Sequence, residues 1–350
     1  MKRSSGRWRH PFGPPYQWMK GEGEGESAGL LSTVEDGGGG VEMVSITVET
    51  RSGKTLCTVS VPASGTVGDL KASIAKANKV LAPHRQWLTL PATGDSKKEK
   101  KVVLAEGTAL ADYGLRNGGV VVVKDLGPQV GYSTVFVLEY TGPLLCYLIP
   151  YFLPALIYPW ADPATHQRRS DVQVAAMAYH TFHYAKRILE TLFVHKFSHA
   201  TMPIFNLVRN CSYYWIAGFF LGYFICHPDY TPVGEAQWKA GFAIALLAQA
   251  SNFYCHVIQS NLRPKGGKGY VIPRGFLFEY FTCANYTAEV TGWLGFNIAT
   301  QTLFGYMFML WGFYTMHAWA VNKHKRLVQL FDGKQGREKY PRRWKIMPFL

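Results

Sequence analysis

Long stretches of this chain lack charged side chains. Residues 210–228, 240–262 and 290–322 contain no Asp, Glu, Lys or Arg, and between residues 127 and 161 the single charged residue is Glu139. Uncharged apolar stretches of this length are typical of helices that cross a lipid bilayer. The absence of charge therefore predicts a membrane protein and excludes a wholly soluble enzyme.

Two patterns that mark common classes of enzyme are also missing. The six cysteines contain no Cys-x-x-Cys pair, and no Gly-x-Gly-x-x-Gly follows a predicted strand. The cysteines are scattered, and five lie in or beside hydrophobic spans, which indicates reduced, buried thiols. The absence of the glycine pattern excludes a soluble Rossmann domain, so membrane helices and basic loops would have to hold any dinucleotide.

The net charge of +14 does not indicate nucleic-acid binding, because of where the charge lies. Residues 321–350 carry nine Lys or Arg residues and two acidic residues, Asp332 and Glu338. The net charge of this segment, 9 − 2 = +7, is half of the total. This segment directly follows an uncharged stretch, a position typical of cytosolic residues beside a membrane span. We therefore expect membrane lipid, and no nucleic acid, as a partner.

Six membrane spans are expected, with both termini in the cytosol. Four of them are predicted near residues 133–157, 172–195, 211–227 and 240–262. The stretch 275–322 begins and ends on the cytosolic side, so it must cross an even number of times. As one helix, its uncharged part would be about 50 Å long against a hydrocarbon core of about 30 Å, which favours two crossings.

The polar N-terminal part divides into two regions. Residues 1–40 are rich in Gly, Pro and Glu and are predicted to be disordered. Residues 41–125 predict a small α+β domain before the transmembrane region at 126–350. Alternating residues predict a hairpin of strands at 44–50 and 55–61, a helix that begins near Thr66 with an apolar face of Leu70, Ile74 and Ala77, and strands at 85–90 and 120–123.

This order resembles ubiquitin, a β-grasp fold. The local matches are Ser52-Gly-Lys-Thr, Thr66-Val-Gly-Asp-Leu-Lys-Ala-Ser-Ile and Leu110-Ala-Asp-Tyr-Gly-Leu. The chain continues past Val123 without a terminal Gly-Gly, which excludes a conjugated modifier.

Ionisable residues gather on one helix face between residues 180 and 195. The face comprises His180, His183, Tyr184, Arg187, Thr191 and His195. Lys186 and Glu190 are spaced to pair at i,i+4. Charge within a membrane span is costly without a partner or a function, so we interpret this face as the wall of a site. The alternative is that Lys186, Arg187 and Glu190 mark the helix end at the lipid headgroups.

Two further polar sets lie on later helices. One stripe, on an otherwise uncharged span, comprises Asn252, His256, Gln259 and Arg263. Hydrogen bonds between helices are the alternative explanation for Asn252 and Gln259. In the second set, Asn285 and Glu289 share a face, and Tyr286 neighbours it.

Several segments together carry a family resemblance. They are His183-Tyr-Ala-Lys-Arg-Ile-Leu-Glu-Thr-Leu-Phe-Val-His-Lys-Phe-Ser-His, Asn210-Cys-Ser-Tyr-Tyr-Trp, Asn261-Leu-Arg-Pro and Cys283-Ala-Asn-Tyr-Thr-Ala-Glu. The chain resembles the very-long-chain trans-2-enoyl-CoA reductases of the endoplasmic reticulum membrane, within the steroid 5α-reductase superfamily. The resemblance covers about residues 44–350 and includes the ubiquitin-like domain.

The resemblance implies reduction of long-chain 2-enoyl-CoA by NADPH, the last step of each fatty-acid elongation cycle, with elongase proteins as partners. It places Tyr184 and Tyr286 beside the reacting atoms, makes Lys186 and Arg187 essential, and has Glu139 support the substrate end. No metal is expected. The residues implied to hold the cofactor are Asn252, His256, Arg263, Asn285, Glu289, Lys323 and His324.

The chemistry of the reaction agrees with these residue types. Hydride addition to the β-carbon of an enoyl thioester places negative charge on the thioester oxygen, which a phenol or a cation must stabilise. The α-carbon then needs a proton. Tyr286 or Tyr184 could meet both requirements.

Three other functions compete with this one. A related reductase could act on a steroid or polyprenol enone. A di-iron lipid oxygenase is imitated by His180-x-x-His183 and His195-x-x-x-His199, but the further histidine ligands that such enzymes need are missing. A non-catalytic membrane adaptor would use the ubiquitin-like domain, yet it would leave the three polar sets unexplained.

Overall fold

The computed structural model describes residues 42–91, 102–165, 168–197, 200–262 and 270–348. The segment 1–40, predicted to be disordered, lies outside the described residues. The chain forms two compact units. The first runs to Val130 and includes Thr201–Ile204, and the second comprises Gly131–Ala200 and the chain from Phe205 onward.

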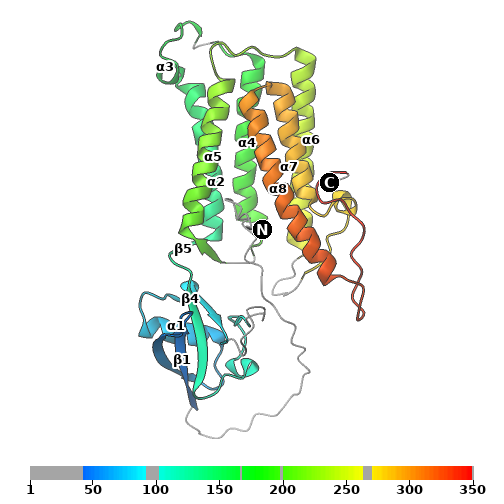
Figure 1. Cartoon of the computed structure of the whole chain (residues 1–350). Coiled ribbons are helices and arrows are strands. Elements are labelled where there is room, and N and C mark those ends of the chain that lie inside the picture. Colours follow the sequence, from blue (N-terminus) through cyan, green and yellow to red (C-terminus); the bar gives the residue numbers. More distant parts are fainter. Residues whose placement is uncertain (1–41, 92–101, 166–167, 198–199, 263–269, 349–350) are drawn as a thin grey trace, which may run out of the picture. The chain divides into compact units, whose positions relative to one another are not determined.

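The first unit contains a four-stranded sheet and one helix (Figure 1). Its elements are β1 (Met43–Thr50), β2 (Thr55–Pro62), α1 (Val67–Ala77), η1 (Pro83–Arg85), β3 (Gln86–Thr89), η2 (Leu110–Tyr113) and β4 (Gly119–Asp125). The strand order is β2-β1-β4-β3, with β1 antiparallel to β2 and parallel to β4. The predicted hairpin, helix and two later strands are therefore confirmed.

Side-chain alternation builds the core of this unit. Val44, Ile46 and Val48 of β1 are buried, because alternate residues of a strand point to the same face. Leu70 and Ile74 of α1 are buried in the same hydrophobic core. The helix begins at a capping box, in which the Thr66 side chain accepts from the Asp69 amide and the Asp69 carboxylate accepts from the Thr66 amide.

The second unit is a bundle of long helices that lie side by side (Figure 1). They are α2 (Tyr132–Phe152), α4 (Asp171–Phe193), α5 (Ile204–Ile225), α6 (Glu235–Asn261), α7 (Ala284–Thr300) and α8 (Leu303–Leu330). Its short elements are the helix α3 (Pro154–Ile157) and the turn η4 (Phe276–Glu279). The strand pair β5 (Gln129–Gly131) and β6 (Thr201–Pro203) belongs to the first unit, except for Gly131. Consecutive long helices run in alternating directions.

The bundle has an apolar exterior. Among the described helices, α2 and α6 are long and apolar enough to cross a membrane. Large apolar side chains are exposed on several helices, including Leu145, Phe193, Phe205, Leu247 and Leu303. Such a surface is stable against lipid rather than water. The predicted break within residues 290–322 lies between α7 and α8, but the number of crossings stays a prediction.

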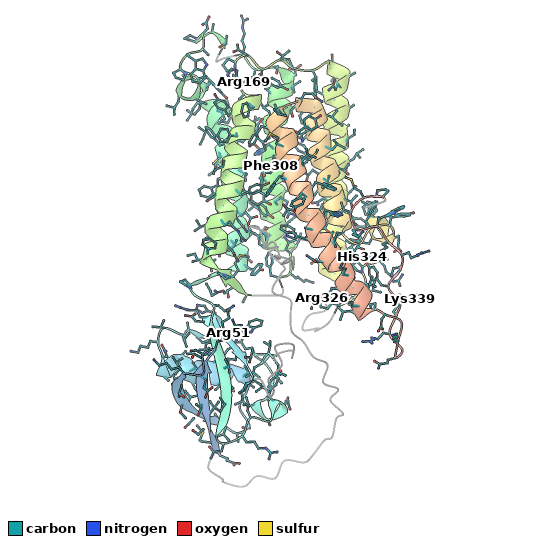
Figure 2. All side chains as sticks on the ribbon, viewed as in Figure 1. Arg51, Arg169, Phe308, His324, Arg326 and Lys339 are labelled. Carbon is teal, nitrogen blue, oxygen red and sulfur yellow. The ribbon has the colours of Figure 1, made fainter. Side chains whose placement is uncertain are left out.

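Aromatic side chains and glycines set the spacing of the helices. Phe308 lies partway along α8 (Figure 2), with its ring centroid 5.7 Å from that of Tyr213 on α5 and 5.0 Å from that of Trp293 on α7. Helices α6 and α7 approach closely at Gly241 and Gly295. A Cβ on Gly295 would lie 2.6 Å from the Gly241 carbonyl oxygen, so this contact requires glycine.

Gly295→Ala is expected to lower the thermal stability of the protein in detergent. The added methyl group would meet backbone atoms of Gly241 and Ala245. Overpacking of this kind costs about 1–3 kcal/mol. The control is Gly312→Ala on α8, whose Cβ would meet only the flexible end of Met316 at 3.8 Å. Equal melting temperatures for the two variants would contradict the close α6–α7 contact.

Candidate active site

The alternating helix directions bring the predicted polar residues to one end of the bundle. The C-terminal halves of α4 and α6 lie at the same end as the N-terminal halves of α2, α5 and α7 (Figure 1). The polar stripes occupy these halves, so residues far apart in the sequence meet there.

Glu190 is the centre of the resulting cluster. Its side chain is 1% exposed, and Lys186 Nζ donates to Oε1 at 2.8 Å. Arg187 Nη1 donates to Oε2 at 2.9 Å, and His256 Nδ1 lies 3.1 Å from Oε1. The predicted Lys186–Glu190 pair is confirmed. Burial of the carboxylate favours a site over a set of charges that mark the helix end at the headgroups.

Asn252 joins the three helices that carry the stripes. Its side-chain oxygen accepts from Lys186 Nζ at 2.8 Å. Its amide nitrogen donates to the Asn285 carbonyl oxygen at 3.0 Å and to Glu289 Oε2 at 3.2 Å. Gln259 also donates to Asn285 Oδ1, at 3.1 Å. The structure therefore brings Lys186, Asn252, Asn285 and Glu289 together, and their role in a shared site stays a prediction.

A second polar row lies deeper in the bundle and was only partly anticipated. Gln249 Nε2 lies 2.9 Å from the Tyr179 hydroxyl and 2.6 Å from His183 Nδ1. His183 Nε2 lies 3.6 Å from Glu289 Oε1. Sequence reasoning missed Gln249 and Tyr179. The available signal was spacing, since Gln249 precedes Asn252 by three residues and Tyr179 precedes His183 by four.

Helix α2 contributes two adjacent buried residues. Glu139, 4% exposed, accepts a hydrogen bond from Asn210 Nδ2 of α5 at 3.2 Å. Tyr140, 5% exposed, accepts a hydrogen bond on its hydroxyl oxygen from Arg187 Nη2 at 2.9 Å. Sequence reasoning selected Glu139 but missed Tyr140. Its position directly after the single charged residue of this span was the only signal.

The two tyrosines selected from sequence lie in different surroundings. Tyr184 is buried, with its ring centroid 4.8 Å from that of His180 and 4.7 Å from that of His183. Tyr286 packs against Trp319 of α8, at 6.2 Å between centroids, and borders the apolar cluster of Cys283, Ala320 and Ile346. Tyr184 thus lies within the α4 polar face, and Tyr286 lies on the side of α7 that meets α8.

The C-terminal segment packs against the start of α7. Its backbone at Trp344 exchanges hydrogen bonds with Tyr280 and Thr282. His324, labelled on α8 in Figure 2, has Nδ1 2.7 Å from Thr282 Oγ1, and the Tyr340 hydroxyl donates to the same oxygen at 3.1 Å. Burial raises the pKa of Tyr340, which keeps this donor protonated. Lys323 is exposed beside His324, and Arg263 lies outside the described residues.

One group of side chains has the composition of a metal site. Ligand atoms of Glu190, His195 and His256 all lie within 4.8 Å of one another. The same carboxylate already binds the ammonium group of Lys186 and the guanidinium of Arg187. A divalent cation there would lie close to two fixed positive charges, which opposes its binding. The absence of a catalytic metal stays a prediction.

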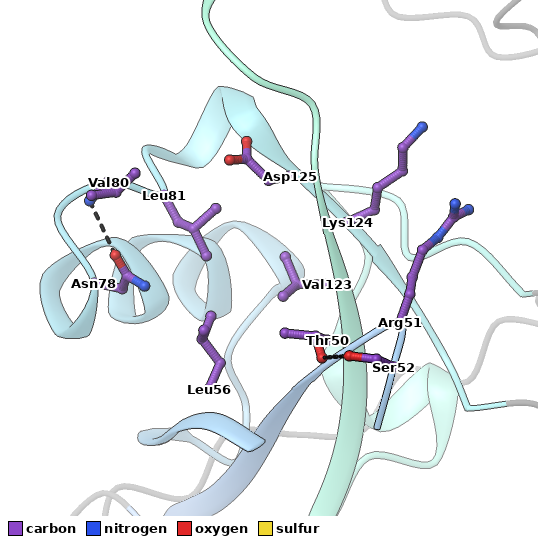
Figure 3. Close-up of a pocket in the computed structure, with 10 residues that line it drawn as sticks. All are labelled: Thr50, Arg51, Ser52, Leu56, Asn78, Val80, Leu81, Val123, Lys124 and Asp125. Atoms are coloured by element: carbon purple, nitrogen blue, oxygen red, sulfur yellow. Dashed lines mark hydrogen bonds between the residues drawn. The ribbon is translucent and has the colours of Figure 1, made fainter. Parts of the chain in front are cut away.

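The first unit has a groove that contains none of the residues selected from sequence (Figure 3). It is lined by Thr50, Arg51, Ser52, Leu56, Asn78, Val80, Leu81, Val123, Lys124 and Asp125. Its polar groups bind nearby partners: Thr50 and Ser52 hydroxyls lie 2.9 Å apart, and the Val80 amide donates to Asn78 Oδ1. Hydrogen bonds from Arg85 lower the pKa of Asp125. These contacts give the groove no evident chemistry.

Comparison with known proteins identifies relatives of the chain by sequence. A family described as 3-oxo-5-alpha-steroid 4-dehydrogenase matches residues 200–350. The very-long-chain enoyl-CoA reductase of Dictyostelium discoideum is 41% identical over 304 residues, which cover 87% of this chain and 98% of that protein. The chain belongs to the very-long-chain enoyl-CoA reductase family.

Other relatives support membership of the very-long-chain enoyl-CoA reductase family. A probable very-long-chain enoyl-CoA reductase of Caenorhabditis elegans is 38% identical over 297 residues, covering 82% of this chain and 92% of that protein. The human trans-2,3-enoyl-CoA reductase-like protein is 33% identical over 290 residues, covering 80% and 77%. The match to the steroid dehydrogenase family includes Asn252 and Glu289, whereas Lys186 and Arg187 lie upstream of it.

Glu190→Gln is expected to destabilise this member of the enoyl-CoA reductase family strongly. The substitution leaves two cations without their buried counter-charge, and breaking a buried pair costs roughly 3–5 kcal/mol. Glu235→Gln is the matched control, because Glu235 forms an i,i+4 pair with Lys239 at an exposed position. Loss of this exposed ion pair should lower the free energy of unfolding by less than about 1 kcal/mol. Equal thermal shifts in detergent for the two variants would disprove the structural role of Glu190.

Proposed function

We propose that the protein is an NADPH-dependent reductase that converts long- and very-long-chain trans-2-enoyl-CoA to saturated acyl-CoA. This is the final reduction of the fatty-acid elongation cycle. The observation that carries the proposal is the buried network in which Lys186 and Arg187 converge on Glu190 inside an apolar bundle. The names of the whole-chain relatives supply the substrate class.

The network suits the charge that develops in this reaction. Reduction at C3 of an enoyl thioester places negative charge on the thioester oxygen. Fixed cations stabilise such charge far better in a site that excludes water than in solution. Lys186 and Arg187 are held by hydrogen bonds before any substrate arrives, so little reorganisation is needed when the charge develops. Glu139, beside Tyr140 on α2, would support the substrate end.

The donor set at this end of the bundle fits a nicotinamide dinucleotide. Amide and carboxylate groups suit the carboxamide and ribose, and exposed cations suit the phosphates. We assign the binding to Asn252, His256, Asn285 and Glu289 with Lys323 and His324, and to Arg263 outside the described residues. NADPH, when bound, supplies the hydride to C3. A tyrosine supplies the proton to C2, and the family resemblance places Tyr184 and Tyr286 beside the reacting atoms.

The cellular setting follows from the same proposal. The bundle would cross the endoplasmic reticulum membrane six times, with both termini in the cytosol. The basic C-terminal segment fits that side. The sheet domain at residues 41–125 would be a ubiquitin-like module that contacts elongase proteins. Its strand order and its parallel β1–β4 pair support the ubiquitin-like fold in this proposal.

A second candidate is reduction of a steroid or polyprenol enone. The match of residues 200–350 to a family described as 3-oxo-5-alpha-steroid 4-dehydrogenase favours it. Both reactions add hydride to a double bond conjugated with a carbonyl group, so the same network would serve either one. They differ in the substrate that must be accommodated.

A substrate panel with the purified protein tests the proposal. Consumption of NADPH should be rapid with trans-2-enoyl-CoA of long chain length and should stay near background with a steroid enone or a polyprenol. EDTA should leave the rate unchanged, because the reaction needs no metal. Faster turnover of the steroid enone would reject the enoyl-CoA assignment in favour of the second candidate, and loss of activity with EDTA would reject the metal-free mechanism.

A shortened chain that begins at Gly127 should keep the chemical step. It retains the β5–β6 pair and all the residues of the buried network. The expected kcat in detergent lies within about threefold of the full-length value, since domains with their own core fold separately. NADPH binding by the shortened chain is measured as the control for correct folding. A shortened chain that binds NADPH but reduces no enoyl-CoA would mean that residues 41–125 take part in substrate recognition.

A further inference from the structure

Tyr140 has a contact that distinguishes it from the other tyrosines near the cluster. Its hydroxyl oxygen accepts a hydrogen bond from Arg187 Nη2 at 2.9 Å. The guanidinium carbon of Arg187 also lies 5.0 Å from the centroid of the Tyr140 ring. Since Tyr140 is only 5% exposed, this contact is made largely away from solvent.

Arg187 itself is fixed by the rest of the network. Its Nη1 donates to Glu190 Oε2 at 2.9 Å, and the other oxygen of that carboxylate accepts from Lys186. Glu190, itself bound by Lys186, therefore holds the guanidinium where it can donate to the phenol oxygen. The hydroxyl hydrogen of Tyr140 meets no acceptor among the described residues. The Tyr140 oxygen accepts a hydrogen bond from Arg187, and its own hydrogen remains available to a substrate. A phenol in this arrangement can act as a proton donor.

The surroundings of Tyr140 favour such a role. Its ring centroid lies 5.9 Å from that of Phe136, 6.0 Å from that of Tyr214 and 6.3 Å from that of Tyr184. These rings form an aromatic environment in which electrostatic interactions are strong. A phenol that gives up its proton becomes negatively charged, and the hydrogen bond from a guanidinium stabilises that charge.

Tyr184 and Tyr286 lie in other surroundings. The ring neighbours of Tyr184 on α4 are two histidines, His180 and His183. Tyr286 packs against Trp319 and the apolar residues between α7 and α8. Of the three tyrosines, Tyr140 is the one whose hydroxyl bonds the guanidinium of Arg187.

We propose that Tyr140 is the general acid of the reduction, an assignment that rests on the proposed enoyl-CoA reductase function. The hydride forms the new C3–H bond, and the electrons of the C2=C3 double bond pass into the thioester enolate. The enolate then takes the hydroxyl proton of Tyr140 at C2, which gives the saturated thioester. The phenolate left behind is held by Arg187 and regains a proton from solvent, so each turnover consumes one hydride and one proton.

The test compares Tyr140→Phe with the wild-type protein, using NADPH and a long-chain trans-2-enoyl-CoA in D₂O. Removal of the acid should lower kcat roughly 100- to 10,000-fold, with little change in the KM of either substrate. The position of deuterium at C2 is the second readout. Wild-type protein should give one configuration at C2, because its acid is fixed on one face. The residual product of Tyr140→Phe should contain both configurations, since solvent then supplies the proton.

Tyr214→Phe is the matched control, because Tyr214 neighbours Tyr140 on α5 and lies outside the proposed machinery. It should keep normal turnover and a single C2 configuration. The proposal is overturned if Tyr140→Phe behaves like this control, or if Tyr184→Phe or Tyr286→Phe mixes the configurations instead. A mixed product from the wild-type protein would also overturn it, even if Tyr140→Phe fails to fold. Wild-type protein that reduces no enoyl-CoA would refute the function itself.

Discussion

The burial of Glu190 is the constraint on which the rest of the site depends. A carboxylate that is 1% exposed inside an apolar bundle is stable only with counter-charges and hydrogen bonds close by. Lys186 and Arg187 supply the charges from the same helix, and His256 approaches from α6. Once these partners are required, the rotation of α4 and the register of α6 against it are both fixed. Arg187 in turn fixes the side of α2 that faces the cluster.

The charges of the cluster nearly balance, and this bears on the proposed catalysis. Two cations, Lys186 and Arg187, face two carboxylates, Glu190 and Glu289, through direct contacts or through Asn252. A strongly positive site would bind any anion tightly, so it would stabilise the transition state little more than the bound substrate. A balanced, rigid cluster stabilises negative charge mainly as that charge develops, which is the property that accelerates a reaction.

Local features could be predicted from the sequence, whereas contacts between helices could not. The hairpin, the helix start at Thr66 and the Lys186–Glu190 pair each depend on residues a few positions apart. Periodicity also showed that α4 and α6 have polar faces. It could not show that Arg187 binds Tyr140, because that contact depends on how α2 and α4 are rotated about their axes. The partners of Gln249 depend on the same rotations, so the deeper polar row was missed.

Helices α6 and α7 make two different kinds of contact, and together these explain how a bundle can hold a polar site. At Gly241 and Gly295 their backbones touch, so this end tolerates no added atom. Toward the other end, the helices are joined through the side chains of Asn252, Gln259 and Glu289. These hydrogen bonds hold the two helices in register. The glycine contact thus anchors the pair at one end, and the polar end can present its groups to a ligand without loss of rigidity.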